Sequence, residues 1–138
     1  MLKIKVMNLN GASRKDIGNL GERVAAEYLR RRGFTILGRN ITKKTGELDI
    51  VAQEGKTLYF VEVKTLLCKE FPRSARYESI YSPAENLHPY KLRKVVRTAE
   101  WYVAEKVWKG DWQVDGMLVW LRARDALAKV RYLPQIVQ

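Results

Sequence analysis

The stretch from Gly46 to Leu66 constrains the fold most, because its residues alternate as they do in a β-hairpin. Its sequence is GELDIVAQEGKTLYFVEVKTL. Successive side chains of a strand point to opposite faces of the sheet. On the first arm, one face is predicted to carry Glu47, Asp49, Val51 and Gln53, and the other Leu48, Ile50 and Ala52. On the second arm, one face is predicted to carry Leu58, Phe60, Glu62, Lys64 and Leu66, and the other Tyr59, Val61 and Val63.

The two arms are predicted to meet at a turn made by Gly55 and Lys56. Gly at the first position suits a type II′ turn, which matches the twist of the strands on either side. Glu54 then faces Thr57 across the hairpin. Counting back along both arms gives three further facing pairs: Val51 with Phe60, Asp49 with Glu62, and Glu47 with Lys64.

The facing carboxylates of Asp49 and Glu62 are unfavourable in a purely structural sheet. Like charges opposite each other destabilise a sheet, and two carboxylates in one partly buried site raise one pKa. A divalent cation between them removes the repulsion, since hard cations such as Mg²⁺ bind carboxylate oxygens. The alternative is a solvated face with a Glu47–Lys64 ion pair. The whole constellation, in so apolar a hairpin, favours the metal site.

The composition limits both the size of the protein and the kind of metal site. A chain of 138 residues suits one domain, and 46% hydrophobic with 30% charged residues is typical of a globular fold. Cys68 is the single cysteine and His88 the single histidine, which excludes a thiolate zinc cluster and a His-rich site. Any metal must therefore be held mainly by oxygen atoms.

Charge and targeting signals indicate the partner and the compartment. The net charge of +11 favours a polyanionic partner, most simply nucleic acid, although a generally basic protein remains an alternative. No apolar run reaches the length of a membrane span, and the N-terminus lacks the apolar segment of a signal peptide. We therefore expect a cytoplasmic protein without a membrane partner. A homodimer is one alternative for its oligomeric state.

The remaining pattern predicts one domain over residues 16–138 with the element order αβββαββ. Residues 1–15 are either an edge strand or a basic tail. Helices are expected at about 17–32 and 89–107, and strands at about 34–41, 47–53, 57–66, 112–121 and 129–137. A long loop is expected between the third strand and the second helix.

Phosphodiester hydrolysis is the chemistry that such an acidic hairpin suits. The reaction needs an activated water and positive charge where the phosphate gains negative charge. Asp49 and Glu62 are predicted to hold Mg²⁺ or Mn²⁺, and the carbonyl of Val63 can add a ligand. Lys64 is predicted to orient the water or stabilise the transition state. Glu22 either leans over this end of the sheet or is a helix-start acid favoured by the helix dipole.

Basic residues are predicted to bind phosphates at two places. Arg73 and Arg76 lie in the long loop, and Lys91 and Lys94 lie near the start of the second helix. One face of that helix combines charge with aromatic surface, as nucleic-acid grooves do, through Tyr90, Arg93, Lys94, Arg97 and Trp101. On the sequence alone, a solvated helix face is the stronger interpretation of this set.

Four segments carry a resemblance to a known family: GNLGERVAAEYLRRRGFTILGRN, GELDIVA, LYFVEVKT and SPAENLHPYKLRKVVRTAEWYV. They resemble the bacterial YraN family of predicted endonuclease-like proteins, which is similar in turn to the Holliday-junction-resolvase branch of the PD-(D/E)xK nucleases. The resemblance implies an α/β fold with a restriction-endonuclease-like αβββαβ core, in which helices flank a central mixed sheet.

The resemblance also implies roles for individual residues. Asp49 matches the first acid of the nuclease motif, Glu62 the second acid and Lys64 the lysine. Glu22 matches the helix acid of the resolvase branch, and Lys91 matches a lysine at the start of the second helix. The implied activity is Mg²⁺-dependent cleavage of DNA, with preference for particular DNA structures. The alternative is a module that kept this fold and binds nucleic acid without cutting it.

Overall fold

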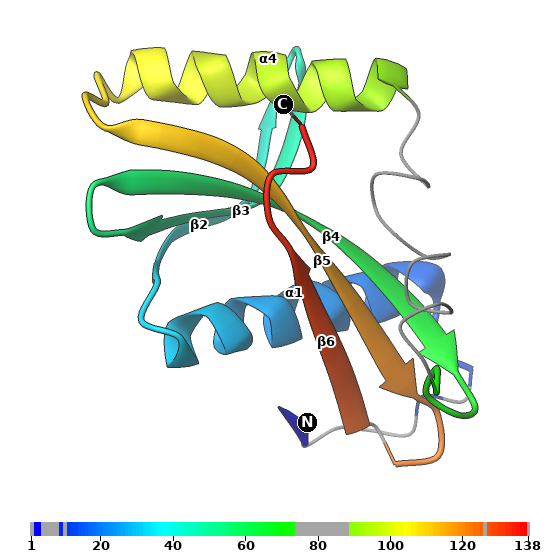
Figure 1. Cartoon of the computed structure of the whole chain (residues 1–138). Helices are drawn as coiled ribbons and strands as arrows, with labels where there is room; N and C mark the ends of the chain where they lie inside the picture. Colours follow the sequence, from blue (N-terminus) through cyan, green and yellow to red (C-terminus); the bar gives the residue numbers. More distant parts are fainter. Residues whose placement is uncertain (1, 4–8, 10, 74–88, 126, 138) are drawn as a thin grey trace.

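The computed structural model describes residues 2–3, 9, 11–73, 89–125 and 127–137 (Figure 1). Its elements are β1 (Leu2–Lys3), α1 (Arg14–Arg31), β2 (Thr35–Lys43), β3 (Gly46–Glu54), β4 (Thr57–Cys68), α4 (Pro89–Glu105), β5 (Asp111–Arg122) and β6 (Leu127–Leu133). The described strands form a six-stranded sheet in the order β1-β6-β5-β4-β3-β2. β4 and β5 run parallel and the other neighbours run antiparallel, so the sheet is mixed.

The two described helices cover opposite faces of this sheet (Figure 1). Under α1, the buried cluster includes Leu20, Val24, Ala25, Leu29, Ile50, Val61, Met117 and Val119. Under α4, it includes Leu48, Val51, Leu58, Phe60, Val95, Ala99, Tyr102 and Val114. Because apolar residues fill both interfaces, the sheet is the middle layer of three. The α/β class with a mixed sheet flanked by helices is confirmed.

Helix α1 begins earlier than the apolar period predicted, because a capping box closes its first turn. The Ser13 hydroxyl accepts a hydrogen bond from the backbone N–H of Asp16 at 3.1 Å. The Asp16 carboxylate accepts one from the backbone N–H of Ser13 at 3.4 Å. Both contacts satisfy donors that the start of a helix leaves without a partner. The helix therefore starts at Arg14.

The predicted register of the β3–β4 hairpin is confirmed from the turn to the middle of the sheet. Gly55 has a φ of 59°, as the first residue of a type II′ turn requires. Five pairs follow, from Glu54↔Thr57 to Ile50↔Val61, and they include Val51↔Phe60. The ladder ends there. The first half of β3 pairs only with β2, and the second half of β4 pairs with β5.

Three details of the predicted hairpin are wrong. The predicted facing pairs Asp49–Glu62 and Glu47–Lys64 are absent from the β3–β4 ladder, which ends at Ile50↔Val61. The alternative ion pair between Glu47 and Lys64 does not form among the described residues either, and Glu47 accepts a hydrogen bond from the Thr42 hydroxyl at 3.2 Å. Leu48 does not share a face with Ile50, because it packs in the cluster under α4. On β2, Asn40 lies between the ladder pairs Arg39↔Ile50 and Ile41↔Leu48, and it has a φ of 51°. A left-handed residue there breaks the alternation of the β2–β3 ribbon.

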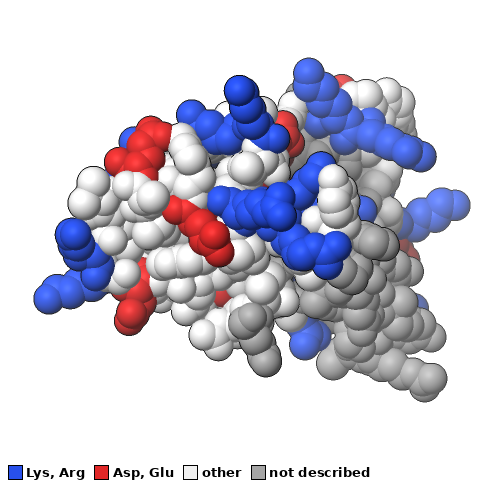
Figure 2. Space-filling view, turned by 90° about the horizontal axis from the view of Figure 1, so that it is seen from above, with Lys and Arg blue, Asp and Glu red and all other residues white. Residues whose placement is uncertain are grey.

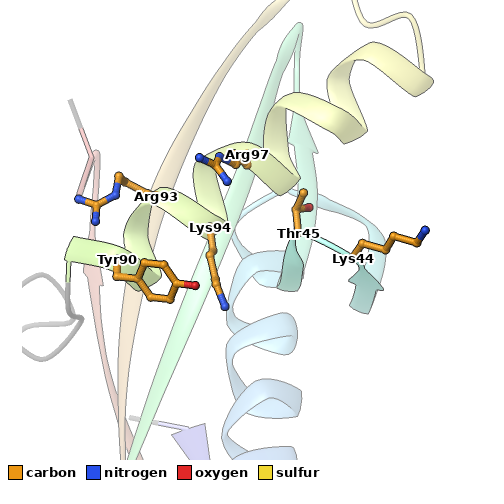
Figure 3. A pocket seen from close by; sticks show the side chains of 6 residues that line it. All are labelled: Lys44, Thr45, Tyr90, Arg93, Lys94 and Arg97. Atoms are coloured by element: carbon orange, nitrogen blue, oxygen red, sulfur yellow. The ribbon is translucent and has the colours of Figure 1, made fainter.

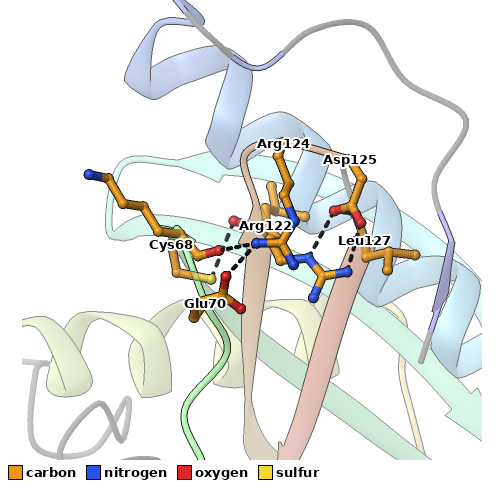
Figure 4. Close-up of polar contacts among 8 residues, drawn as sticks. Cys68, Glu70, Arg122, Arg124, Asp125 and Leu127 are labelled. Carbon is orange, nitrogen blue, oxygen red and sulfur yellow. Dashed lines mark hydrogen bonds and ion pairs between the residues drawn. The ribbon is translucent and has the colours of Figure 1, made fainter.

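A polar cluster ties the end of β4 to the β5–β6 hairpin (Figure 4). Arg122 donates to both carboxylate oxygens of Asp125, and Arg124 pairs with Glu70. The thiol of Cys68 donates to the carbonyl of Leu121 at 3.5 Å. Most of these side chains are exposed, and exposed ion pairs each contribute only about 0–1 kcal/mol. The cluster therefore fixes geometry more than it adds stability.

No helix among the described residues is long and apolar enough to cross a lipid bilayer.

Candidate active site

The candidate active site lies at the fork where β3 leaves β4. Beyond the Ile50↔Val61 pair, the backbone ladder between these strands stops. The side chain of Asp49 replaces it, because its Oδ2 accepts a hydrogen bond from the backbone N–H of Val63 at 2.9 Å. This bond holds the Asp49 carboxylate against β4, beside the residue that follows Glu62. The two acids predicted from the hairpin are therefore brought together, although no ladder pair joins them.

Glu62 is an acid held in an almost fully buried position. Its residue is 5% exposed, and its Oε1 atom has no hydrogen-bond partner among the described residues. The pKa of Glu62 is raised to about 8, first by burial and then by the nearby charge of Asp49. An ionised carboxylate with one buried oxygen left without a partner is costly in such a place. The site is thus poorly suited to two bare carboxylates and well suited to a bound cation.

Asp49 shares this environment but has two compensating hydrogen bonds. Burial raises the pKa of Asp49, while the hydrogen bonds with the Val63 N–H and with the side chain of Glu62 act in the opposite direction. The charge of Lys91 also lowers the pKa values of both Asp49 and Glu62. Lys91 itself is exposed near the start of α4. The first turns of α4 therefore bring a cation within electrostatic reach of the acid pair.

Glu22 reaches the same site from helix α1. Its pKa is raised to about 7, first by burial and then by the charge of Asp49, while the charge of Arg39 opposes the shift. Its Oε1 atom is also buried without a hydrogen-bond partner in the described part of the chain. Of the two interpretations left open for Glu22, the structure favours the one in which this acid leans over the sheet.

A close approach between α1 and β4 allows Glu22 to reach the acids. A Cβ atom built on Gly21 would lie 1.8 Å from the hydroxyl oxygen of Thr65, so only glycine fits against this strand. Gly21 is fully packed at the interface and precedes Glu22 by one residue. The backbone of α1 therefore approaches β4 closely at Gly21, next to Glu22.

Arg39 is a site residue that the sequence reasoning missed. It pairs with Ile50 in the β2–β3 ladder, and its Nε atom is buried without a partner among the described residues. Its charge acts on Glu22. A signal was present in the sequence, because a basic residue stands in the middle of a strand predicted to neighbour the acidic hairpin. Its position beside the acidic hairpin depends on the register in which β2 pairs with β3.

Lys64 lies on β4 two residues after Glu62 and is exposed. Within the described ranges it forms no ion pair with any of the three acids. Its catalytic role therefore stays a prediction. The same holds for the carbonyl of Val63 as a metal ligand, because the structure records only what the N–H of that residue does.

The donor set fits a hard cation with a partial protein shell. No three His, Cys, Asp or Glu side chains within the described ranges lie close enough together to bind one ion. Two carboxylates are nevertheless enough protein ligands for Mg²⁺, which retains several waters. The buried, unpartnered Oε1 of Glu62 and the raised pKa values of the acid pair agree with such a site.

The predicted phosphate-binding residues lie in different places. Lys94 lines a basic pocket beside α4, together with Lys44, Thr45, Tyr90, Arg93 and Arg97 (Figure 3). Arg73 is exposed beyond the end of β4, where its charge acts on Glu70. The structure therefore does not bring Arg73 together with the pocket. Arg76 lies outside the described residues.

The comparisons with known proteins agree with the resemblance found in the sequence. A family model described as "Uncharacterised protein family UPF0102" matches residues 21–121. The UPF0102 proteins of Clostridium botulinum and Syntrophotalea carbinolica are 41% and 45% identical over 93 residues, and that of Clostridium tetani is 39% identical. Each alignment covers 67% of this chain and 68% of the relative. The chain therefore belongs to the UPF0102 family, which is the YraN family.

Proposed function

We propose that this protein is a metal-dependent nuclease that hydrolyses phosphodiester bonds in DNA. One observation carries the proposal. Asp49 is held against β4 by the Val63 N–H, beside a Glu62 carboxyl that is buried and has an oxygen without a partner. Two ionised carboxylates this close together are costly in so buried a place, and a hard cation between them would offset that cost.

Mg²⁺ or Mn²⁺ bound by Asp49, Glu62 and the Val63 carbonyl would polarise the scissile phosphate as a Lewis acid. The protein's own residues supply the other requirements. With a pKa of about 7, the Glu22 carboxyl can accept or return a proton near neutral pH. Lys91, whose charge acts on both acids, and Lys64, two residues after Glu62, would supply positive charge where the phosphate gains negative charge in the transition state.

The direct test is a cleavage assay with labelled single strands, duplexes, flaps and four-way junctions of DNA, and with matched RNA. Each substrate is incubated with Mg²⁺, Mn²⁺ or EDTA. We expect cleavage of DNA that depends on metal and is lost in Glu62→Gln. Glu54→Gln, which removes an exposed acid at the far end of the same hairpin, should retain it. Cleavage by the pure protein that survives both EDTA and Glu62→Gln would refute the proposed site.

A second candidate is a nucleic-acid-binding module that does not cut. The observation in its favour is that the described residues contain no group of three metal-binding side chains. This candidate expects salt-sensitive binding to nucleic acid and no cleavage of any substrate with either metal. The same assay decides between the two functions.

A further inference from the structure

The basic pocket beside α4 is lined mainly by cations that form no ion pair within the described part of the chain. Four of its six lining residues are cations: Lys44, Arg93, Lys94 and Arg97. None of these four forms an ion pair within the described part of the chain. Figure 2 shows Lys and Arg side chains gathered over this side of the molecule. A surface on which like charges gather attracts a polyanion of the opposite charge.

Buried contacts hold the two walls of this pocket together. One wall is the β2–β3 turn and the other is the first half of α4. The hydroxyl groups of Thr45 and Thr98 share a hydrogen bond at 2.8 Å, and Thr98 also donates to the carbonyl of Lys94 at 2.8 Å. Thr98 is fully buried. Gly46, with a φ of 146°, allows the turn to approach, since a Cβ there would lie 3.3 Å from the Thr98 hydroxyl. The pocket is therefore formed before any ligand arrives.

The shape of the pocket suits an unpaired nucleotide better than a double helix. Its volume is about 340 Å³, near the lower end of the range for small-ligand pockets, roughly 300–1,000 Å³. Its lining includes the ring of Tyr90, a residue that is 56% exposed, with the Lys94 ammonium 4.6 Å from the ring centroid (Figure 3). A duplex hides its base faces, whereas a single strand can stack a base on such a ring.

The pocket lies beside the candidate active site along α4. Lys91, whose charge acts on Asp49 and Glu62, is one helical turn before Lys94. The helix rises about 9 Å from Lys91 to Arg97, which is enough to follow two or three phosphates of one strand. A strand that passes the acid pair can therefore continue into the pocket.

We infer that the pocket between the β2–β3 turn and α4 binds an unpaired nucleic-acid strand, with phosphates on Lys44, Lys94 and Arg97 and a base on Tyr90. The inference rests on the proposed function for its class of substrate. Together with the proposed function, a pocket of this kind specifies a substrate whose strand is unpaired next to the cleavage site. The pocket residues hold that strand and take no part in the chemistry.

The experiment measures binding in EDTA, so that it does not depend on cleavage. The probe is a fluorescent oligothymidylate, with a blunt duplex of equal length as comparison, titrated across rising potassium chloride. Lys44→Gln/Lys94→Gln removes two charges from the pocket. Lys56→Gln/Lys109→Gln removes two exposed lysines at the other end of β3 and is the matched control.

We expect the pocket variant to bind the single strand roughly tenfold more weakly at moderate salt, and its salt slope to fall by about 1.4, since each phosphate contact on a single strand contributes about 0.7. The control should keep the slope of the parent. Tyr90→Ala should weaken single-strand binding on the order of tenfold, with less effect on the duplex, while Tyr90→Phe retains it.

Equal losses in the pocket and control variants would overturn the inference, as would parent-like binding by the pocket variant or tighter binding of the duplex than of the single strand. The outcome for the nuclease is separate. Binding as expected without cleavage would leave the pocket and remove the proposed activity. Cleavage together with parent-like binding by the pocket variant would overturn the inference about the pocket and leave the proposed activity.

Discussion

Replacing Glu62 by Gln should change how the stability of the metal-free protein depends on pH. The pKa of Glu62 is about 8 in the folded protein, against an ordinary value of 4.5. Between these values the folded protein keeps a proton that the unfolded chain has lost. Stability is therefore greatest below pH 4.5 and falls as the pH rises toward 8, because the unfolded state is favoured by its ionised carboxylate.

The size of the effect follows from the two pKa values. Each pH unit in this window is worth about 1.4 kcal/mol, so that the parent should lose on the order of 3 kcal/mol between pH 5 and pH 8 through Glu62. The residue is 5% exposed, so solvent screens little of this cost. Glu62→Gln keeps the shape and removes the titration. Over the same pH range, the free energy of unfolding of Glu62→Gln should therefore fall by about 3 kcal/mol less than that of the parent.

The assay is urea unfolding in EDTA at several pH values between 5 and 8, for the parent, Glu62→Gln and Glu54→Gln. The exposed Glu54 serves as the control and its variant should follow the parent. Added Mg²⁺ should then raise the stability of the parent at pH 8 but not that of Glu62→Gln, because a ligand that binds only the folded state stabilises it. Parallel pH curves for the parent and Glu62→Gln would refute the reasoning.

Three further predictions concern single side chains. Asp49→Asn should be at least as stable as the parent in EDTA and inactive with Mg²⁺, because it removes the charge that raises the pKa of Glu62; a much lower melting temperature would make Asp49 a structural residue. Gly21→Ala should cost roughly 1–3 kcal/mol in urea unfolding, since its Cβ would overlap Thr65, and Thr65→Ala should recover part of the loss; additive losses in the double variant would contradict this. Asp115→Ala should cost roughly 3 kcal/mol or more, because this buried carboxylate accepts three hydrogen bonds, yet the variant should keep the response to Mg²⁺; an unchanged stability would show that these bonds contribute nothing net.

Local patterns in the sequence were enough to predict the hairpin and its acids. The turn at Gly55 and the alternation on both arms set the register that the structure confirms from Glu54↔Thr57 to Ile50↔Val61. These features depend on neighbouring residues and on the period of a strand. Both helices were predicted for the same reason, because the apolar face of a helix repeats every 3.6 residues.

Contacts between distant segments decided how those parts make a site. The β3–β4 ladder stops at Ile50↔Val61, where β4 continues along β5 and Asp49 bonds to Val63 in its place. Strand β6 ends at Leu133, short of its predicted end, where the N–H of Gln135 donates to Asp115. Neither outcome has a signal in the local sequence.

The sequence by itself therefore determined which residues are candidates for the site, and the tertiary structure decided which of them meet. Asp49 and Glu62 could be identified from a pattern within one hairpin. Glu22 joins them because Gly21 lets α1 approach β4, and the basic pocket forms because Thr45 bonds to Thr98, 53 residues away in the chain. Periodicity is a property of short segments, whereas these encounters depend on packing between segments that only the folded chain brings together.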